Sequence, residues 1–188
     1  MSLFRGQSTG SYGNGAIQTA VRAIERLPKA NFEALAAREI EQALRDAVIK
    51  TPQLHFEARR GKRVSEEKVV REFGQHVVHK IDYVDVIVPF SGNKTAFQLS
   101  PSHQIMNTMG TLNTDGDAIV IRLPDDERLE QQLESAISQI STNLGNFTED
   151  MSALAAEMKQ VLSGVVERRK QLFSEQEARD TTRSFPID

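Results

Sequence analysis

The spacing of apolar residues first follows a helical period. Residues 17–27 and 31–49 carry apolar side chains at every third or fourth position, which predicts two helices that each bury one face. Pro28 separates them, and Asn31 is a suitable N-cap for the second. Residues 6–15 hold four glycines, no apolar pattern and no lysine of a phosphate-binding loop, so they predict a flexible lead-in.

The period then shortens to that of strands. Residues 82–90 alternate strictly and are rich in β-branched residues, which favours a central strand with both faces covered. Shorter stretches predict further strands and turns: strands at 53–58, 95–99 and 115–123, the last after an Asp-Gly turn, a basic turn at 58–63 and a turn at 91–94. Residues 65–74 predict a short helix that begins at Ser65.

A third period appears in the last part of the chain. Ten apolar residues follow one another in steps of four and three without a slip, the 3.5-residue repeat of a coiled-coil seam. They are Leu133, Ile137, Ile140, Leu144, Phe147, Met151, Leu154, Met158, Val161 and Val165. We call this set the heptad stripe. It predicts a long helix over residues 125–175.

Two glycines raise an alternative for this helix. Gly145 and Gly164 each cost about 1 kcal/mol in a helix interior, and a helical hairpin that turns near Gly145 is the natural competitor. A turn would have no reason to preserve the heptad phase, and the phase is preserved. We therefore favour one helix.

The length of the heptad stripe suggests self-association. A helix of about 45 residues is ~70 Å long. A domain made from the remaining ~125 residues has a radius of gyration of only ~14 Å. Such a domain is too small to cover the whole stripe, so a second copy is expected to cover the rest. The alternative is a helical bundle within one chain.

These patterns define the expected fold class. It is α+β, with an N-terminal helical pair, a small antiparallel sheet and a long C-terminal coiled-coil helix. The expected division is a flexible lead-in at 1–15, an α+β domain at 16–124, the long helix at 125–175 and a tail at 176–188.

Composition narrows the function classes. The 188 residues contain no cysteine, which excludes disulfides, thiolate nucleophiles and zinc–sulfur sites. The net charge of −3 calls for neither a nucleic-acid nor a membrane partner. No apolar run approaches the ~20 residues of a membrane-spanning helix, and the N-terminus has no apolar core of signal-peptide length. We expect a cytoplasmic protein without a cofactor.

The segment HVVHKIDYVDVIVPF (76–90) is the best candidate for chemistry. On a helix, His76 and His79 would share a face and could hold a metal ion. On a strand, residues three apart point to opposite faces, which separates the two histidines and also Asp82 from Asp85. The alternation favours a structural strand, so we assign no catalytic or metal-binding residue.

A basic set supplies an alternative function. Four cations surround one glycine in residues 59–63, and such a set can contact phosphates electrostatically. These are Arg59, Arg60, Lys62 and Arg63. No aromatic stacking residues accompany them, and three glutamates flank them. Nucleic-acid binding is therefore the second hypothesis.

A resemblance covers residues 79–174. HKIDYVDVIVPFSGNKTAFQLSPS, followed by a helix that ends FTEDMSALAAEMKQVLSGVVERRKQLFS, is similar to the accessory region of poorly characterised bacterial multidomain proteins that can carry a restriction-endonuclease-like domain. The acidic-plus-lysine signature of that domain has no match in this chain. The resemblance implies an accessory role beside DNA-directed or defence machinery, with the chemistry on another polypeptide.

The first hypothesis for function follows from the heptad stripe. We expect a non-enzymatic assembly or adaptor module that forms a homo-oligomer through this stripe and docks a protein partner, with no membrane partner. A small hydrolase using His76, His79 or Asp85 is a third and weaker reading.

Overall fold

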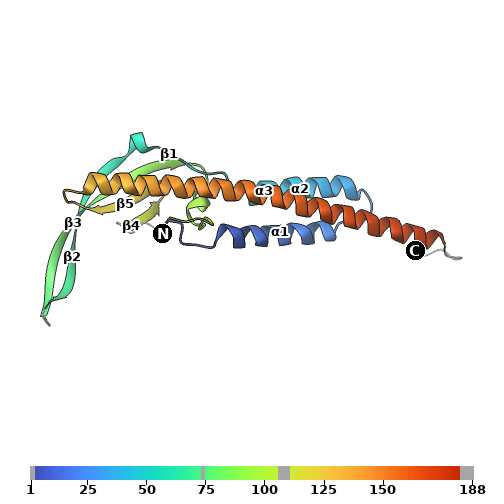
Figure 1. Ribbon diagram of the computed structural model, residues 1–188, viewed down its shortest axis with the longest axis horizontal. Helices are drawn as coiled ribbons and strands as arrows, with labels where there is room; N and C mark the ends of the chain where they lie inside the picture. Colours follow the sequence, from blue (N-terminus) through green and yellow to red (C-terminus); the bar gives the residue numbers. More distant parts are fainter. Residues whose placement is uncertain (1–2, 73–74, 106–110, 183–188) are drawn as a thin grey trace. The chain divides into compact units, whose positions relative to one another are not determined.

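A computed structural model describes residues 3–72, 75–105 and 111–182 (Figure 1). Its regular elements are, in order, α1 (Thr9–Glu25), α2 (Phe32–Ala47), β1 (Gln53–Leu54), the 3-10 helix η1 (Phe56–Ala58), β2 (Arg60–Glu72), β3 (Gln75–Ser91), the 3-10 helix η2 (Lys94–Phe97), β4 (Thr111–Asp115), β5 (Ala118–Pro124) and α3 (Leu129–Thr181). The fold class is α+β, with a small antiparallel sheet and a long C-terminal helix, as the patterns predict.

The chain divides into two compact units, and the division differs from the expected one. The first unit combines Met1–Thr9 with Lys50–Glu149, and the second combines Gly10–Ile49 with Asp150–Asp188. Helix α3 contributes residues to both units, so it is not a separate domain. We describe each unit by itself.

The first unit is built around β3. This strand pairs antiparallel with β1 and β2 along one edge and with β5 along the other, and β5 pairs with β4 through the turn at Gly116. The positive φ of Gly116, 57°, is the left-handed conformation that such hairpin turns require. The central position predicted for residues 82–90 is therefore confirmed. The cover expected on both faces is not, because Tyr83, Asp85 and Ile87 on the second face are only partly buried.

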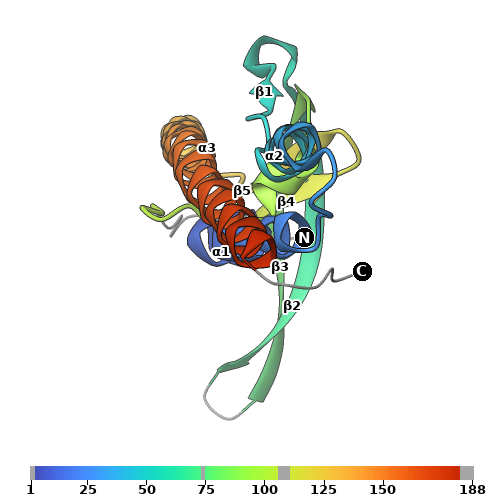
Figure 2. The same cartoon turned by 90° about the vertical axis from the view of Figure 1, so that its right-hand side faces the viewer.

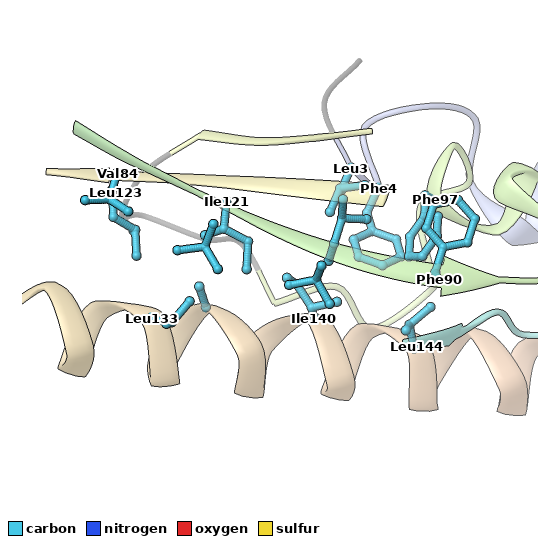
Figure 3. Close-up of a cluster of buried hydrophobic side chains, with 14 residues drawn as sticks. Leu3, Phe4, Val84, Phe90, Phe97, Ile121, Leu123, Leu133, Ile140 and Leu144 are labelled. Atoms are coloured by element: carbon cyan, nitrogen blue, oxygen red, sulfur yellow. The ribbon is translucent and has the colours of Figure 1, made fainter. Parts of the chain in front are cut away.

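The apolar core lies on one face of this sheet. Alternate residues of β3 and β5, including Val86, Val88, Ile119 and Ile121, point to that face and are buried. Figure 3 shows the same cluster against residues of α3 such as Ile140. The period-two pattern of the strands thus meets the helical pattern of α3, which buries apolar surface on both.

The N-terminal segment is part of this core, so the flexible lead-in expected at 1–15 is wrong for its described residues. Leu3 and Phe4 are buried, and the Phe4 amide donates to the Phe97 carbonyl at 2.7 Å. A Cβ at Gly6 would lie 1.9 Å from the Gln98 carbonyl oxygen. Glycine therefore serves close approach here, and α1 begins at Thr9.

One buried polar side chain of α3 holds a loop. The Asn143 side chain accepts a hydrogen bond from the Ile105 amide at 2.8 Å and donates one to the Ile105 carbonyl at 2.9 Å. The two bonds satisfy the amide group of a residue that is only 4% exposed. The heptad pattern gave no sign of this polar position.

The second unit is helical. Helices α1 and α2 lie alongside the C-terminal part of α3 (Figures 1 and 2). A Cβ at Gly13 would lie 2.8 Å from a Leu154 methyl carbon, which shows how closely α1 approaches α3. At the other end, the rings of Phe32 and Phe173 pack edge to face, with centroids 5.2 Å apart. Asn31 precedes α2 as predicted, but its side chain makes no capping hydrogen bond.

Helix α3 is continuous across Gly145, so the hairpin alternative is wrong. Neither Gly145 nor Gly164 has a neighbour within 4 Å of an added Cβ. Both glycines face away from other parts of the chain and weaken the helix without breaking it. The helix continues to Thr181, beyond the expected end at residue 175.

The buried side of α3 follows a straight helix rather than a coiled-coil seam. Near its start Ala136 is buried and Ile137 only partly, and near its end Leu162 is buried and Val161 only partly. A straight helix drifts about 20° per heptad from a 3.5-residue repeat. Over the length of the stripe this moves the buried position by about one residue, as observed.

Three local predictions were wrong. Residues 65–74, expected as a helix, belong to β2 for their described part, and the predicted strand at 95–99 is largely replaced by η2. The predicted strand at 53–58 is reduced to β1 followed by η1. In the first case tertiary pairing with β3 overrides a plausible helix start, and the β-branched Val69 and Val70 agree with the strand.

Candidate protein-docking surface

The longest unsupported element of the first unit is the outer part of the β2–β3 hairpin. Strand β5 pairs with β3 only from Tyr83 to Pro89, whereas β2 pairs with β3 from Arg60↔Ile87 to Glu72↔Gln75. Residues 65–72 and 75–82 therefore form a two-stranded ribbon, which we call the outer arm. Figures 1 and 2 show it extending away from the other strands of the sheet.

The outer arm carries most of the exposed large apolar side chains. Val69 is 64% exposed, Val78 57% and Val70 41%, and only Ile105 and Leu172 join them among the described residues. Val69 lies opposite Val78 on one face, and Val70 lies opposite Val77 on the other. Apolar residues gathered on a ribbon without a covering layer mark a binding surface.

Charges surround the valines on the Val69 face. Glu67 lies opposite Lys80 toward the base of the outer arm, and Arg71 lies opposite His76 toward its end. All four are exposed. Along β2 the valine is thus flanked by an acidic residue on one side and a basic residue on the other.

A polar cluster fixes the base of the outer arm on the face turned away from α3. The Arg122 guanidinium of β5 donates two hydrogen bonds to Asp85, at 2.6 and 2.8 Å, and a third to Glu66 of β2. The hydrogen bonds to Asp85 raise the pKa of Arg122. One side chain thereby ties β2, β3 and β5 together at the point where the two-stranded ribbon begins.

Tyr83 extends this cluster. Lys68 donates a hydrogen bond to the Tyr83 hydroxyl at 3.0 Å, and this bond raises the pKa of the Lys68 ammonium group. The Arg122 guanidinium lies 5.9 Å from the centroid of the same ring. The residues are engaged with one another and make a structural support for the outer arm.

The core-side face of the base has its own contacts. Arg63 forms an ion pair with Asp125 at 3.1 Å, Ser65 donates to Asp82, and the Asp125 amide donates to the Asp82 carbonyl at 3.0 Å. The base of the outer arm is therefore held on both faces. Only its distal half, with the valines, lacks such support.

The structure places the predicted chemical residues apart. His76 and His79 lie on opposite faces of β3, and so do Asp82 and Asp85. His55 contacts Ser91 and Glu57, and it is distant in the sequence from both the histidine pair and the aspartate pair. Within residues 3–72, 75–105 and 111–182, no group of three potential ligands could hold a metal ion.

The four cations at residues 59–63 do not form a basic turn. They precede or occupy the start of β2, so Arg60 and Lys62 point to one face and Arg63 to the other. Arg63 is paired with Asp125, and Arg59 donates to the Phe56 carbonyl at 3.2 Å. The geometry brings no more than two of them together for a phosphate.

The heptad stripe is not an open surface either. Eight of its ten residues are buried within the single chain, and the exceptions, Ile137 and Val161, are partly buried. The premise that the chain is too small to cover the stripe is wrong. Segments that precede the long helix in the sequence, the strands and the N-terminal helices, cover it.

An open groove in the second unit offers little chemistry. It is lined by residues of the α1–α2 connection, of the start of α2 and of α3, among them Phe32 and Phe173. Its charged groups are paired: Lys29 with Glu177 at 2.7 Å and Lys170 with Glu33 at 2.8 Å. No charge is left there to orient a ligand.

Comparisons with protein-family models, with curated proteins and with solved structures find no match to the chain. The predicted resemblance to accessory regions beside restriction-endonuclease-like domains therefore stays a prediction. Within the part of the chain that the structure describes, no helix combines the length and hydropathy needed to cross a bilayer.

Sequence reasoning missed the outer arm. Val69, Val70 and Val78 were read as parts of a short helix and of a covered strand. A usable signal was present, because each valine pair, Val69–Val70 and Val77–Val78, stands equally far from the Phe73-Gly74 dipeptide. Two β-branched pairs placed symmetrically about a glycine-containing dipeptide are typical of a hairpin.

Proposed function

We propose that this protein is a non-enzymatic assembly module that docks a protein partner through the outer arm of β2 and β3. One observation carries the proposal: three exposed valines lie on a two-stranded ribbon that no other strand among the described residues pairs with. A two-stranded hairpin is marginally stable in water, and pairing or packing with another chain removes both its apolar exposure and its instability.

The role is the one expected from the sequence, but the contact surface is different. The heptad stripe is buried inside the chain, so it serves folding, and the outer arm takes over the docking role. The predicted place beside DNA-directed or defence machinery rests on the resemblance alone. We leave nucleic-acid binding as the weaker candidate because the cations of residues 59–63 are divided between two faces.

Crosslinking from the outer arm tests the proposal. The photoreactive residue p-benzoylphenylalanine replaces Val78 in the full chain, expressed in its source organism, and crosslinked proteins are identified by mass spectrometry. We expect protein adducts whose yield falls when Val69→Asp is added, because a charge in the apolar patch opposes docking.

A matched control uses the same photoreactive residue at Ser163, an exposed position on α3. Adducts from position 78 that do not exceed those from position 163 would contradict an outer arm that docks proteins. Circular dichroism of each variant establishes that the fold is retained.

A further inference from the structure

The open edge of β2 carries a self-complementary pattern around Val69. In the described part of the chain β2 pairs with β3 alone, which leaves the other edge of Arg60–Glu72 without a neighbouring strand. An unpaired edge is a template for pairing with another strand. Glu67 stands two residues before Val69, and Arg71 stands two residues after it.

Symmetry restricts how this edge meets a second copy of itself. Two identical strands that pair antiparallel are related by a two-fold axis perpendicular to the sheet, so one residue must lie opposite itself. Each possible register is then defined by that central residue. Registers centred on Glu66, Glu67 or Lys68 place identical charges opposite each other at the axis, which is unfavourable.

The registers centred on Val64 and Ser65 also meet like charges. The first places Arg60 opposite Lys68 of the second copy, and the other places Lys62 opposite Lys68. The register centred on Val69 places Val69 against Val69 and Glu67 against Arg71 on both sides of the axis. On this face every contact is either apolar or between opposite charges. A register centred on Val70 would also pair Lys68 with Glu72, but it spans only residues 68–72 of the strand, whereas the register centred on Val69 spans 66–72.

The partners in this register are free to form it. Glu67 and Arg71 are exposed and make no ion pair with a described residue, so pairing breaks no internal bond. On the other face this register places Glu66 opposite Glu72 of the second copy at each end, and the ion pair of Glu66 with Arg122 offsets that like-charge contact. Val69 and Val70, the exposed valines of β2, both lie within the paired segment.

We infer that two copies of this chain associate by antiparallel pairing of their β2 edges, with the two-fold axis at Val69. The inference rests on the proposed docking role of the outer arm and names its partner as a second copy. The product is a four-stranded ribbon in the order β3, β2, β2, β3, which passes the three-strand threshold for stability in water. Each β2 strand contributes only seven residues, so the interface is small. We therefore expect a weak dimer, with a dissociation constant in the micromolar range.

Charge reversal provides the test. In the Val69 register, position 67 of one copy faces position 71 of the other. The Glu67→Arg variant therefore places two arginines opposite each other on each side of the axis, and the Arg71→Glu variant places two glutamates there. We expect each single variant to associate at least about tenfold more weakly than the wild-type chain in sedimentation equilibrium. An equimolar mixture of the two variants should form a heterodimer, because every pair is then opposite in charge. The double variant with both changes should dimerise again.

Arg60→Glu is the control, because it reverses a charge of β2 outside the paired segment 66–72. It should leave dimerisation unchanged. A wild-type chain that stays monomeric throughout the micromolar range, or single variants that dimerise like the wild type, would overturn the inference.

Crosslinks from position 78 separate this result from the proposed function. Adducts with a second copy support both statements. Adducts with a different protein from a monomeric chain overturn the inference and leave the docking role standing. An outer arm that yields neither kind of adduct overturns both.

Discussion

The heptad stripe of α3 is buried by its own chain, whereas the apolar residues of the outer arm of β2–β3 are exposed. The stripe has the repeat of an intermolecular seam, and the chain buries eight of its ten residues itself. The outer arm contains short valine pairs among charges, and three of its valines are among the most exposed apolar residues described. Regular spacing therefore identifies a buried face, but it does not say whose atoms bury it.

The difference has a physical cause. A helix has one apolar side that any apolar layer can cover, and both the sheet and the α1–α2 pair supply such a layer. A two-stranded ribbon has two faces and an open edge, and in the described part of the first unit no strand pairs with β3 beyond Tyr83 to cover them. The surface available to partners is thus set by how far the neighbouring strand extends.

The largest effect is expected inside the stripe. Phe147→Ala should lower the free energy of unfolding by about 4 kcal/mol, because the ring is fully buried and leaves a cavity. Chemical denaturation measures it. Val69→Ala on the outer arm is the matched change and should alter stability by no more than about 0.5 kcal/mol. Equal losses from both variants would erase the contrast between the two regions.

A second pair of variants distinguishes a straight buried face from a coiled-coil seam. Leu162→Ala should cost about 3 kcal/mol, because Leu162 is fully buried although it lies outside the heptad stripe. Val161→Ala, within the stripe but only partly buried, should cost about 1 kcal/mol or less. A larger loss of stability for Val161→Ala than for Leu162→Ala, in thermal or chemical unfolding, would instead support a coiled-coil seam.

The third prediction concerns the base of the outer arm. Arg122→Ala leaves Asp85, which is only 13% exposed, without its bidentate partner, and should cost about 2 kcal/mol. Amide hydrogen exchange should rise in β2 and in the outer half of β3, with the core residues of β5 changed little. Arg60→Ala, on the same face of the sheet but without an ion pair to a described residue, is the control. Exchange that rises evenly over the sheet would speak against a local role at the base.

The smallest expected effect is a gain in the free energy of unfolding. Gly145→Ala should stabilise the protein by about 1 kcal/mol, because the position is helical and an added Cβ meets no neighbour. Gly6→Ala should destabilise it, because the same Cβ would collide with the Gln98 carbonyl. A loss of stability in Gly145→Ala would mean that the helix is interrupted there.

Much of the fold could be predicted from local pattern. The helices at α1 and α2, the central strand β3, the Asp-Gly hairpin and the uninterrupted α3 all follow from periodicity and turn residues. The coverage of α3 could not, because it depends on contacts between segments distant in the sequence. The outer arm was missed because Ser65 followed by two glutamates competes, as a helix start, with the hairpin signal of the valine pairs. The pairing of Val69 with Val78 decides between the two.

Asn143 binds Ile105 through two hydrogen bonds, and one of them depends on the side-chain nitrogen. The side-chain amide offers one donor and one acceptor to the same residue, as a neighbouring strand would. Conversion of this asparagine to aspartate, by mutation or by deamidation during ageing, replaces the donor with a second oxygen that faces the Ile105 carbonyl. The loop that leads to Ile105 would then be held to the helix mainly by Asn146, which donates to the His103 carbonyl. This amide is therefore a point where chemical damage loosens the loop while the apolar core stays whole.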